Sequence, residues 1–313
     1  MLANGYKAGA QGVAFNFYGD TLHFNTDKSF IIPFPEKPTQ EAIHGFIAQL
    51  EQSDYQNCLQ SLISYKEQYK PDDWLFYQLI RKTAESISPK AQNYYRYTLY
   101  KWFLLAHTGY DASLALCDDK LLFYVQSDEL IYDIPYRMKN GKQYVCLNYH
   151  DYGGHIDFDS NKFMEIAINV PAASKPFSYK VTQLPGFTPQ DYEEKDLSFN
   201  YHEMTYKFKV KINPEVKKIF ANYPVTDYQA YFNMPLSNGT YQSLIPALKK
   251  NIKHMSVKNG VDYLMRFTRY AFLYEPDQQS FGKEKRLSPE QTLLYEYSDC
   301  EDRSALFFYL VKE

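Results

Sequence analysis

The sequence predicts an α+β fold with more than one domain, and three observations support this prediction. Apolar residues recur every three to four positions over 39–107 and then every second position over 112–148, which indicates helices followed by an antiparallel sheet. Short strand-like stretches with prolines between them fill 151–235, and a helical period resumes after Pro235. At 313 residues the chain is long enough for two or three separate hydrophobic cores.

Residues 1–38 form an N-terminal β segment in this interpretation. Alternating apolar residues over 13–34, interrupted at Gly19-Asp20, predict a hairpin. The first seven residues lack the apolar core of a signal peptide, so we expect an exported or periplasmic location only if such a peptide has been removed.

Residues 39–150 are predicted to be one α+β domain. Thr39 precedes an apolar period of three to four and is a candidate N-cap. We expect four helices, which begin near 39, 54, 73 and 92. The strands expected after them are Ala112–Leu116, Leu121–Gln126, Leu130–Ile134 and Gln143–Asn148, with a hairpin turn at Asn140-Gly141.

The remaining chain is divided at residue 235. Residues 151–235 predict a β-sandwich-like middle domain, with strands at Phe163–Val170, Tyr179–Gln183, Leu197–Tyr201 and Tyr206–Ile212. Residues 236–313 predict a helical region that ends in a helix at 299–312.

Composition excludes several classes of function. The net charge is −3 with both signs interspersed, which argues against a nucleic-acid partner. No apolar run reaches the roughly 18 residues of a membrane span. The four cysteines include no CxxC pair, so neither a zinc site nor a disulfide framework is indicated, and we predict no cofactor. Tyrosine and phenylalanine number 31 and 22, which fits either a packed β-rich core or a groove that stacks on sugars or peptides.

Cys300 is the candidate catalytic residue. Ser298 and Glu301 have the spacing of a capping box, which would place Cys300 in the first turn of the final helix. Free N–H groups and the helix dipole there favour a thiolate and an oxyanion, whereas the acidic neighbours Asp299, Glu301 and Asp302 oppose the thiolate. The alternative, an inert core cysteine on an apolar helix, stays open.

A weak internal repeat accompanies this helix. Residues 303–311 and 96–104 share a leading arginine and an aromatic-aliphatic pattern, and superposing the arginines puts Asn93 at the place of Cys300. Duplication and chance both explain such a pattern.

The stretch from Phe272 to Arg303 resembles bacterial proteins of the transglutaminase-like superfamily. The similarity lies in Tyr274-Glu275-Pro276-Asp277-Gln278, Phe281-Gly282-Lys283-Glu284-Lys285, Pro289-Glu290 and Tyr297-Ser298-Asp299-Cys300-Glu301-Asp302-Arg303. Weaker similarity over Tyr97–Val125 corresponds to the cysteine-lacking part of the same proteins, so 39–150 is expected to be a degenerate copy. The resemblance implies that Cys300 is the nucleophile of a papain-like Cys-His-Asp triad in cysteine-dependent acyl transfer or amide hydrolysis on peptide substrates. It also implies that the His and Asp lie on a sheet that follows this helix.

The sequence leads to two further expectations. Because Glu313 is reached before any such sheet, we expect a chain truncated after the nucleophile helix and inactive by itself, with self-association through an uncovered final helix. Upstream, His150-Asp151 and His155-Ile156-Asp157 flank Gly153-Gly154, which reads either as an interdomain loop or as a weak candidate metal site. The alternative function is non-catalytic binding of a peptide or a glycan.

Overall fold

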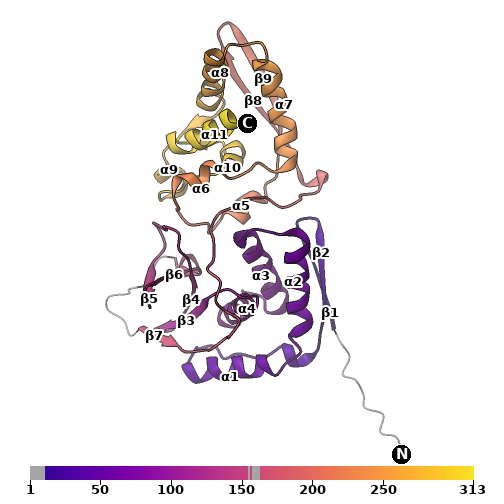
Figure 1. Cartoon of the computed structure of the whole chain (residues 1–313), viewed down its shortest axis with the longest axis vertical. Coiled ribbons are helices and arrows are strands. Elements are labelled where there is room, and N and C mark those ends of the chain that lie inside the picture. Colours follow the sequence, from indigo (N-terminus) through magenta and orange to yellow (C-terminus); the bar gives the residue numbers. More distant parts are fainter. Residues whose placement is uncertain (1–10, 154–155, 157–162) are drawn as a thin grey trace, which may run out of the picture. The chain divides into compact units, whose positions relative to one another are not determined.

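The structure is a computed structural model that describes residues 11–153, 156 and 163–313. Figure 1 shows the order of its elements along the chain. They form two compact units, of which the first ends at Tyr179 and the second runs from Lys180 to Glu313. The predicted boundaries at residues 38, 150 and 235 therefore do not separate compact units.

The first unit combines four helices with a hairpin and a larger sheet. Its elements are β1 (Gln11–Phe17), β2 (Asp20–Thr26), α1 (Gln40–Glu51), α2 (Gln56–Tyr69), α3 (Asp73–Ile87), α4 (Tyr94–His107), β3 (Ala112–Cys117), β4 (Lys120–Gln126), β5 (Tyr136–Lys139), β6 (Lys142–Cys146) and β7 (Phe163–Ile166). The predicted hairpin of β1 and β2, the four helices and the Thr39 N-cap are confirmed; the Thr39 side chain accepts a hydrogen bond from the Ala42 N–H at 3.1 Å. The α+β class is thereby confirmed.

The larger sheet has the order β5-β6-β4-β3-β7, and every neighbouring pair is antiparallel. Asn140 and Gly141 both have positive φ, 52° and 74°, as a two-residue type I′ turn requires. This turn pairs Lys139 with Lys142, so the strand before it must end at Lys139. The predicted strand at Leu130–Ile134 is therefore wrong, and Tyr136–Lys139 is the strand that pairs.

The predicted β-sandwich over 151–235 is also wrong for the described residues. β7 pairs with β3 and so completes the sheet of the first unit. No strand forms at Tyr179–Gln183, and the next two strands, β8 (Glu193–Tyr201) and β9 (Met204–Ile212), pair only with each other in the second unit. Each alternates buried and exposed residues toward its end, so each has one apolar face, and helices of the second unit cover it.

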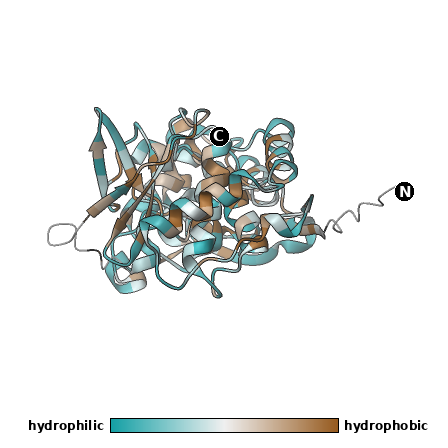
Figure 2. Cartoon of the chain, turned by 90° about the horizontal axis from the view of Figure 1, so that it is seen from below, coloured by the Kyte–Doolittle hydropathy of each residue, from teal (hydrophilic) through white to brown (hydrophobic). Residues whose placement is uncertain are grey.

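The second unit places this hairpin against helices. Its other elements are α5 (Val216–Ile219), α6 (Tyr228–Phe232), α7 (Asn238–Ile252), α8 (Val257–Tyr270), β10 (Leu273–Tyr274), α9 (Asp277–Phe281), α10 (Pro289–Leu294), β11 (Tyr297–Ser298) and α11 (Cys300–Lys312). Phe199, Phe208 and Phe267 stack edge to face or in parallel in its core. In Figure 2 several helices alternate between hydrophobic and hydrophilic residues, as amphipathic helices do.

The final helix is better covered than its sequence predicts. Leu306, Tyr309 and Leu310 belong to the core of the second unit, where α11 packs on α8 and α10. Phe308 and Val311 remain exposed, at 44% and 47%. The expectation of an uncovered final helix is therefore wrong for most of its apolar residues, and self-association stays a prediction that rests on these two exposed side chains.

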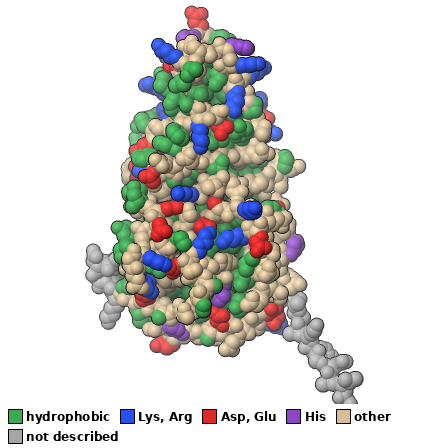
Figure 3. All heavy atoms as spheres, in the orientation of Figure 1, with side chains coloured by type: hydrophobic (Ala, Val, Ile, Leu, Met, Phe, Trp, Pro, Cys, Tyr) green, Lys and Arg blue, Asp and Glu red, His purple; other side chains and the backbone are tan. Residues whose placement is uncertain are grey.

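The surface carries no extended region of one charge in the view of Figure 3, where acidic and basic side chains are interspersed. Hydrophobic side chains gather over α8, whose Val257, Val261 and Met265 are exposed. Within the described residues, no helix combines the length and the apolar character that crossing a membrane requires.

Candidate functional site

The final helix is capped one residue later than predicted. Asp299, not Ser298, is the N-cap: its Oδ1 accepts hydrogen bonds from the N–H groups of Glu301 and Asp302. Asp302 Oδ2 in turn accepts from the Asp299 N–H at 3.3 Å, which closes a capping box between two aspartates. Ser298 is engaged elsewhere, because its Oγ accepts from Arg303 Nε at 3.1 Å.

Cys300 is the first residue of this helix and is exposed. The other three cysteines, all in the first unit, are buried. Burial raises the thiol pKa of Cys58 well above its usual range and that of Cys146 to about 12, so these thiols are poor nucleophiles. The four cysteines form no disulfide. Cys300 is thus the thiol of this chain that a reagent or substrate reaches.

The backbone around Cys300 leaves an N–H available. Asp299 occupies the next two amides of the helix, and Arg303 N donates to the Asp299 carbonyl at 3.3 Å. No hydrogen bond of the Cys300 N–H, and none of its Sγ, is formed with the described residues. An anion next to the sulfur would therefore meet a free donor at the positive end of a helix.

Arg303 fixes the helix start to the preceding elements. Besides Ser298, its guanidinium donates to the carbonyl oxygens of Arg269 and Phe272, both at 3.1 Å. The Arg303 guanidinium carbon lies 5.4 Å from the centroid of the Tyr274 ring. The side chains of Tyr274 and Tyr297 are both exposed. The short parallel ladder of β10 and β11 pairs Tyr274 with Ser298, two residues ahead of the thiol. Cys300 therefore stands on an anchored support beside exposed aromatic rings.

The two helices of the predicted internal repeat, α4 and α11, agree only in part. Arg96 Nε donates to Ser88 Oγ at 2.8 Å, as Arg303 Nε does to Ser298. Asn93 is the N-cap of α4, however, whereas Cys300 follows the N-cap of α11. With the arginines superposed, the two helices begin one residue out of step.

The upstream histidine–aspartate candidate belongs to the first unit, whereas Cys300 belongs to the second. His150 and Asp151 lie in the first unit, where the Asp151 carboxylate accepts hydrogen bonds from Lys90 at 2.7 Å and Tyr94 at 3.0 Å. These contacts give Asp151 a structural role within that unit. Gly154, His155 and Asp157 lie outside the described residues, so the second half of this candidate is not placed.

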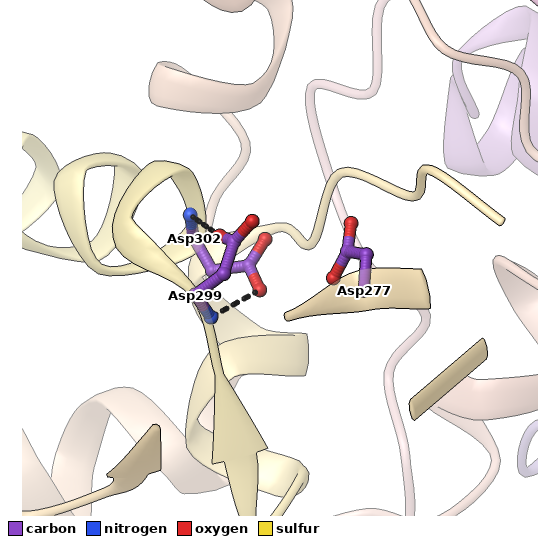
Figure 4. Close-up of side chains that lie close together, drawn as sticks. All are labelled: Asp277, Asp299 and Asp302. Carbon is purple, nitrogen blue, oxygen red and sulfur yellow. Dashed lines mark hydrogen bonds between the residues drawn. The ribbon is translucent and has the colours of Figure 1, made fainter. Parts of the chain in front are cut away.

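Three aspartates of the second unit meet at the start of α11, and sequence reasoning missed this meeting. Oxygens of Asp277, Asp299 and Asp302 lie within 4.8 Å of one another. Figure 4 shows the Asp277 carboxylate across from the other two. Two of the three had been recognised as acidic neighbours of the cysteine, but no periodicity linked them to Asp277, which begins a separate helix after Pro276.

The environment of Asp277 and Asp302 disfavours the negative charge of these two carboxylates. Burial raises the pKa of Asp302 to about 8 and that of Asp277 to about 6, although backbone donors oppose both shifts. Those donors are the N–H of Leu287, 2.8 Å from Asp302 Oδ1, and the N–H of Lys285, 2.7 Å from Asp277 Oδ2. The neighbouring carboxylates add repulsion in the same direction as burial.

Comparison with known proteins assigns this chain to no family: no family model, no curated protein and no solved structure matches it. The resemblance to transglutaminase-like proteins therefore stays a prediction that rests on the motifs around Cys300.

Proposed function

We propose that Cys300 is the nucleophile of a transglutaminase-like protein whose chemistry is acyl transfer or amide hydrolysis on peptide substrates. One observation carries the proposal: of four cysteines, Cys300 alone is exposed, and it stands at the first turn of a thirteen-residue helix. The motif resemblance supports the same residue independently.

The chemistry follows from this position. The thiolate attacks the carbonyl carbon of an amide, the C–N bond breaks, and the amine leaves with a proton, which yields a thioester on Cys300. Water or a second amine then attacks the thioester and restores the thiol. The Cys300 N–H, which has no partner among the described residues, is a candidate donor to the negative charge of the tetrahedral intermediate.

The proton acceptor is the missing part. No described side chain forms a hydrogen bond to Cys300 Sγ, and the resemblance assigns this task to a histidine on a sheet that follows the helix. Without a base the thiol is weakly activated. We therefore expect the 313-residue chain to react with activated esters but not to turn over ordinary amides.

Acyl trapping tests this proposal. After incubation with p-nitrophenyl acetate, we expect peptide mass spectrometry to find a hydroxylamine-sensitive acetyl group on Cys300. Cys300→Ala should remove it, whereas Cys58→Ala, which alters a buried thiol, should leave it unchanged. Absence of acetyl-Cys300 under conditions that acetylate glutathione would contradict the proposal.

Non-catalytic binding is the second candidate, and a polar hollow in the first unit favours it. The hollow, of about 530 Å³, lies between β2 and α2. Its lining includes Asn57, Gln60, Ser64, Tyr65 and Tyr69. The ring centroids of Tyr65 and Tyr69 are 4.4 Å apart. Amides, hydroxyls and aromatic faces are groups that hold sugars and peptides. Ligand binding that is unchanged in Cys300→Ala, together with a failed acyl-trapping experiment, would make this the leading function.

A further inference from the structure

The three aspartates at the start of α11 come from two elements that the fold brings together. Asp277 is the first residue of α9, Asp299 is the N-cap of α11, and Asp302 lies in the first turn of α11. Asp277 and Asp302 are buried, with exposed fractions of 4% and 2%. Two of the three carboxylates thus belong to the interior of the second unit, while Asp299 is partly exposed.

Lys285 attracts this cluster electrostatically, but no described cation forms an ion pair with it. None of its three carboxylates forms an ion pair with a described Lys, Arg or His. The nearby Lys285 directs its ammonium to aromatic rings, 4.7 Å from the centroid of Phe281 and 5.5 Å from that of Tyr295. Buried negative charge without a cation is costly, so an additional positive group would stabilise this arrangement.

A second, independent observation concerns one oxygen atom. Asp277 Oδ1 is inaccessible to solvent and has no hydrogen-bond partner in the described chain, while Oδ2 of the same residue accepts from Lys285 N. Figure 4 shows this carboxylate turned toward those of Asp299 and Asp302. Buried polar atoms nearly always have a partner, so an orphaned carboxylate oxygen facing two further carboxylates indicates a bound cation.

We propose that Asp277, Asp299 and Asp302 bind a divalent cation, specifically Ca²⁺. Carboxylate oxygens are the ligands of hard cations, and the Ca²⁺–oxygen distance of about 2.3–2.6 Å puts opposite ligands about 4.6–5.2 Å apart. The three oxygens lie within 4.8 Å of one another, inside this span. Mg²⁺ demands a stricter octahedron and usually keeps several waters, so a site built from three protein carboxylates favours Ca²⁺.

The existing hydrogen bonds leave room for the ion. The two N–H groups that Asp299 caps both donate to Oδ1, so its Oδ2 remains available. Asp302 uses its oxygens for Leu287 N and Asp299 N, and each oxygen retains a second lone pair. The cation would link α9 and the segment up to Leu287 to the first turn of α11. Asp299 directly precedes Cys300, but the cation proposal does not depend on the thiol chemistry, and Cys300→Ala should bind Ca²⁺ like the unaltered protein.

Hydrogen exchange with and without CaCl₂ tests the site in the full chain. At 10 mM Ca²⁺ we expect about tenfold slower exchange of amides within 277–303, for a dissociation constant on the order of 10⁻³ M. Peptides of the first unit should not change. Titration calorimetry with CaCl₂ should give the same affinity, and MgCl₂ should have a smaller effect.

Asp277→Asn is the decisive variant, because it retains an oxygen for Lys285 N and does not alter the helix cap. It should abolish the Ca²⁺ effect; Asp196→Asn, on the exposed face of β8, should leave it intact. Asp302→Asn should also abolish the effect if the protein folds. Unchanged exchange at 10 mM Ca²⁺, or an equal effect in Asp277→Asn, would overturn the proposal, and an equal effect of Mg²⁺ would overturn the assignment to Ca²⁺.

Discussion

Single charged groups in the interior of the first unit carry clear consequences for stability. Lys101, on α4, is 1% exposed; its Nζ lies 3.9 Å from Asp151 Oδ2 and 4.5 Å from the ring centroid of Tyr97. Burial lowers the pKa of Lys101 to about 7, although the Asp151 charge opposes this shift. An ammonium whose pKa is lower in the folded state makes folding less favourable at low pH.

Lys101→Met should therefore affect stability in a pH-dependent way. Below pH 7 the folded protein holds a buried charge, whereas between pH 7 and 10.5 the unfolded chain binds the proton and the folded one does not. The free energy of unfolding of the unaltered protein thus rises with pH in this window. The stability that Lys101→Met gains over the unaltered protein therefore falls as the pH rises. We expect this gain to be about 3 kcal/mol smaller at pH 9 than at pH 6.

Tryptophan fluorescence during urea unfolding measures this effect. Both tryptophans of the chain, Trp74 and Trp102, are buried in the first unit, so the signal reports that unit. Lys82→Met, which alters an exposed lysine of α3, serves as the matched control. A gain from Lys101→Met that is the same at both pH values would show that Lys101 stays charged in the fold.

Local polar signals were predictable from sequence wherever the partner is near in the chain. Thr39 and the Asn140-Gly141 turn act within three residues, and both were predicted correctly. The N-cap of α11 was placed at Ser298 because the sequence does not reveal that Arg303 occupies its hydroxyl. The meeting of Asp277 with Asp299 and Asp302 depends on tertiary packing and left no local signal.

At the scale of elements, α11 stabilises the second unit through one face. Leu306 is fully buried in its core, whereas Val311 on the same helix is 47% exposed. Leu306→Ala should lower the free energy of unfolding by about 2–5 kcal/mol, because it removes buried methyl groups and leaves a cavity. Val311→Ala should stay within about 0.5 kcal/mol.

Urea unfolding followed by far-UV circular dichroism checks this difference. The tryptophan signal, which reports the first unit, should be unchanged in both variants. If Leu306→Ala costs no more than Val311→Ala, then α11 does not pack on the core, and the expectation of an uncovered helix would return.

Helices were predicted more accurately than strands. The four helices of the first unit have their own amphipathic periods and caps, which are visible locally. Strand pairing depends on distant partners: β7 joins the sheet of the first unit, and β8 and β9 pair in the second. Apolar alternation alone therefore suggested a sandwich, because it shows that a strand has a buried face but not which element buries it.

At the scale of the whole molecule, the described residues cluster into two compact units. The boundary after Tyr179 falls inside a proline-containing stretch without strands, where sequence composition changes little. Cys58, Cys117 and Cys146 are buried in the first unit, and Cys300 is exposed in the second. The central claim, that Cys300 is a nucleophile, therefore concerns the exposed thiol of the second unit.

Iodoacetamide labelling of all four cysteines tests this claim most directly, with each rate measured in the native and in the urea-unfolded chain. We predict that native Cys300 reacts about two- to fivefold faster than unfolded Cys300, because its unpaired N–H and the helix N-terminus favour the charge that develops as the sulfur attacks. The three buried thiols should react far more slowly in the native chain than in the unfolded one. A native rate for Cys300 equal to or below its unfolded rate would show an exposed thiol without activation and would contradict the account.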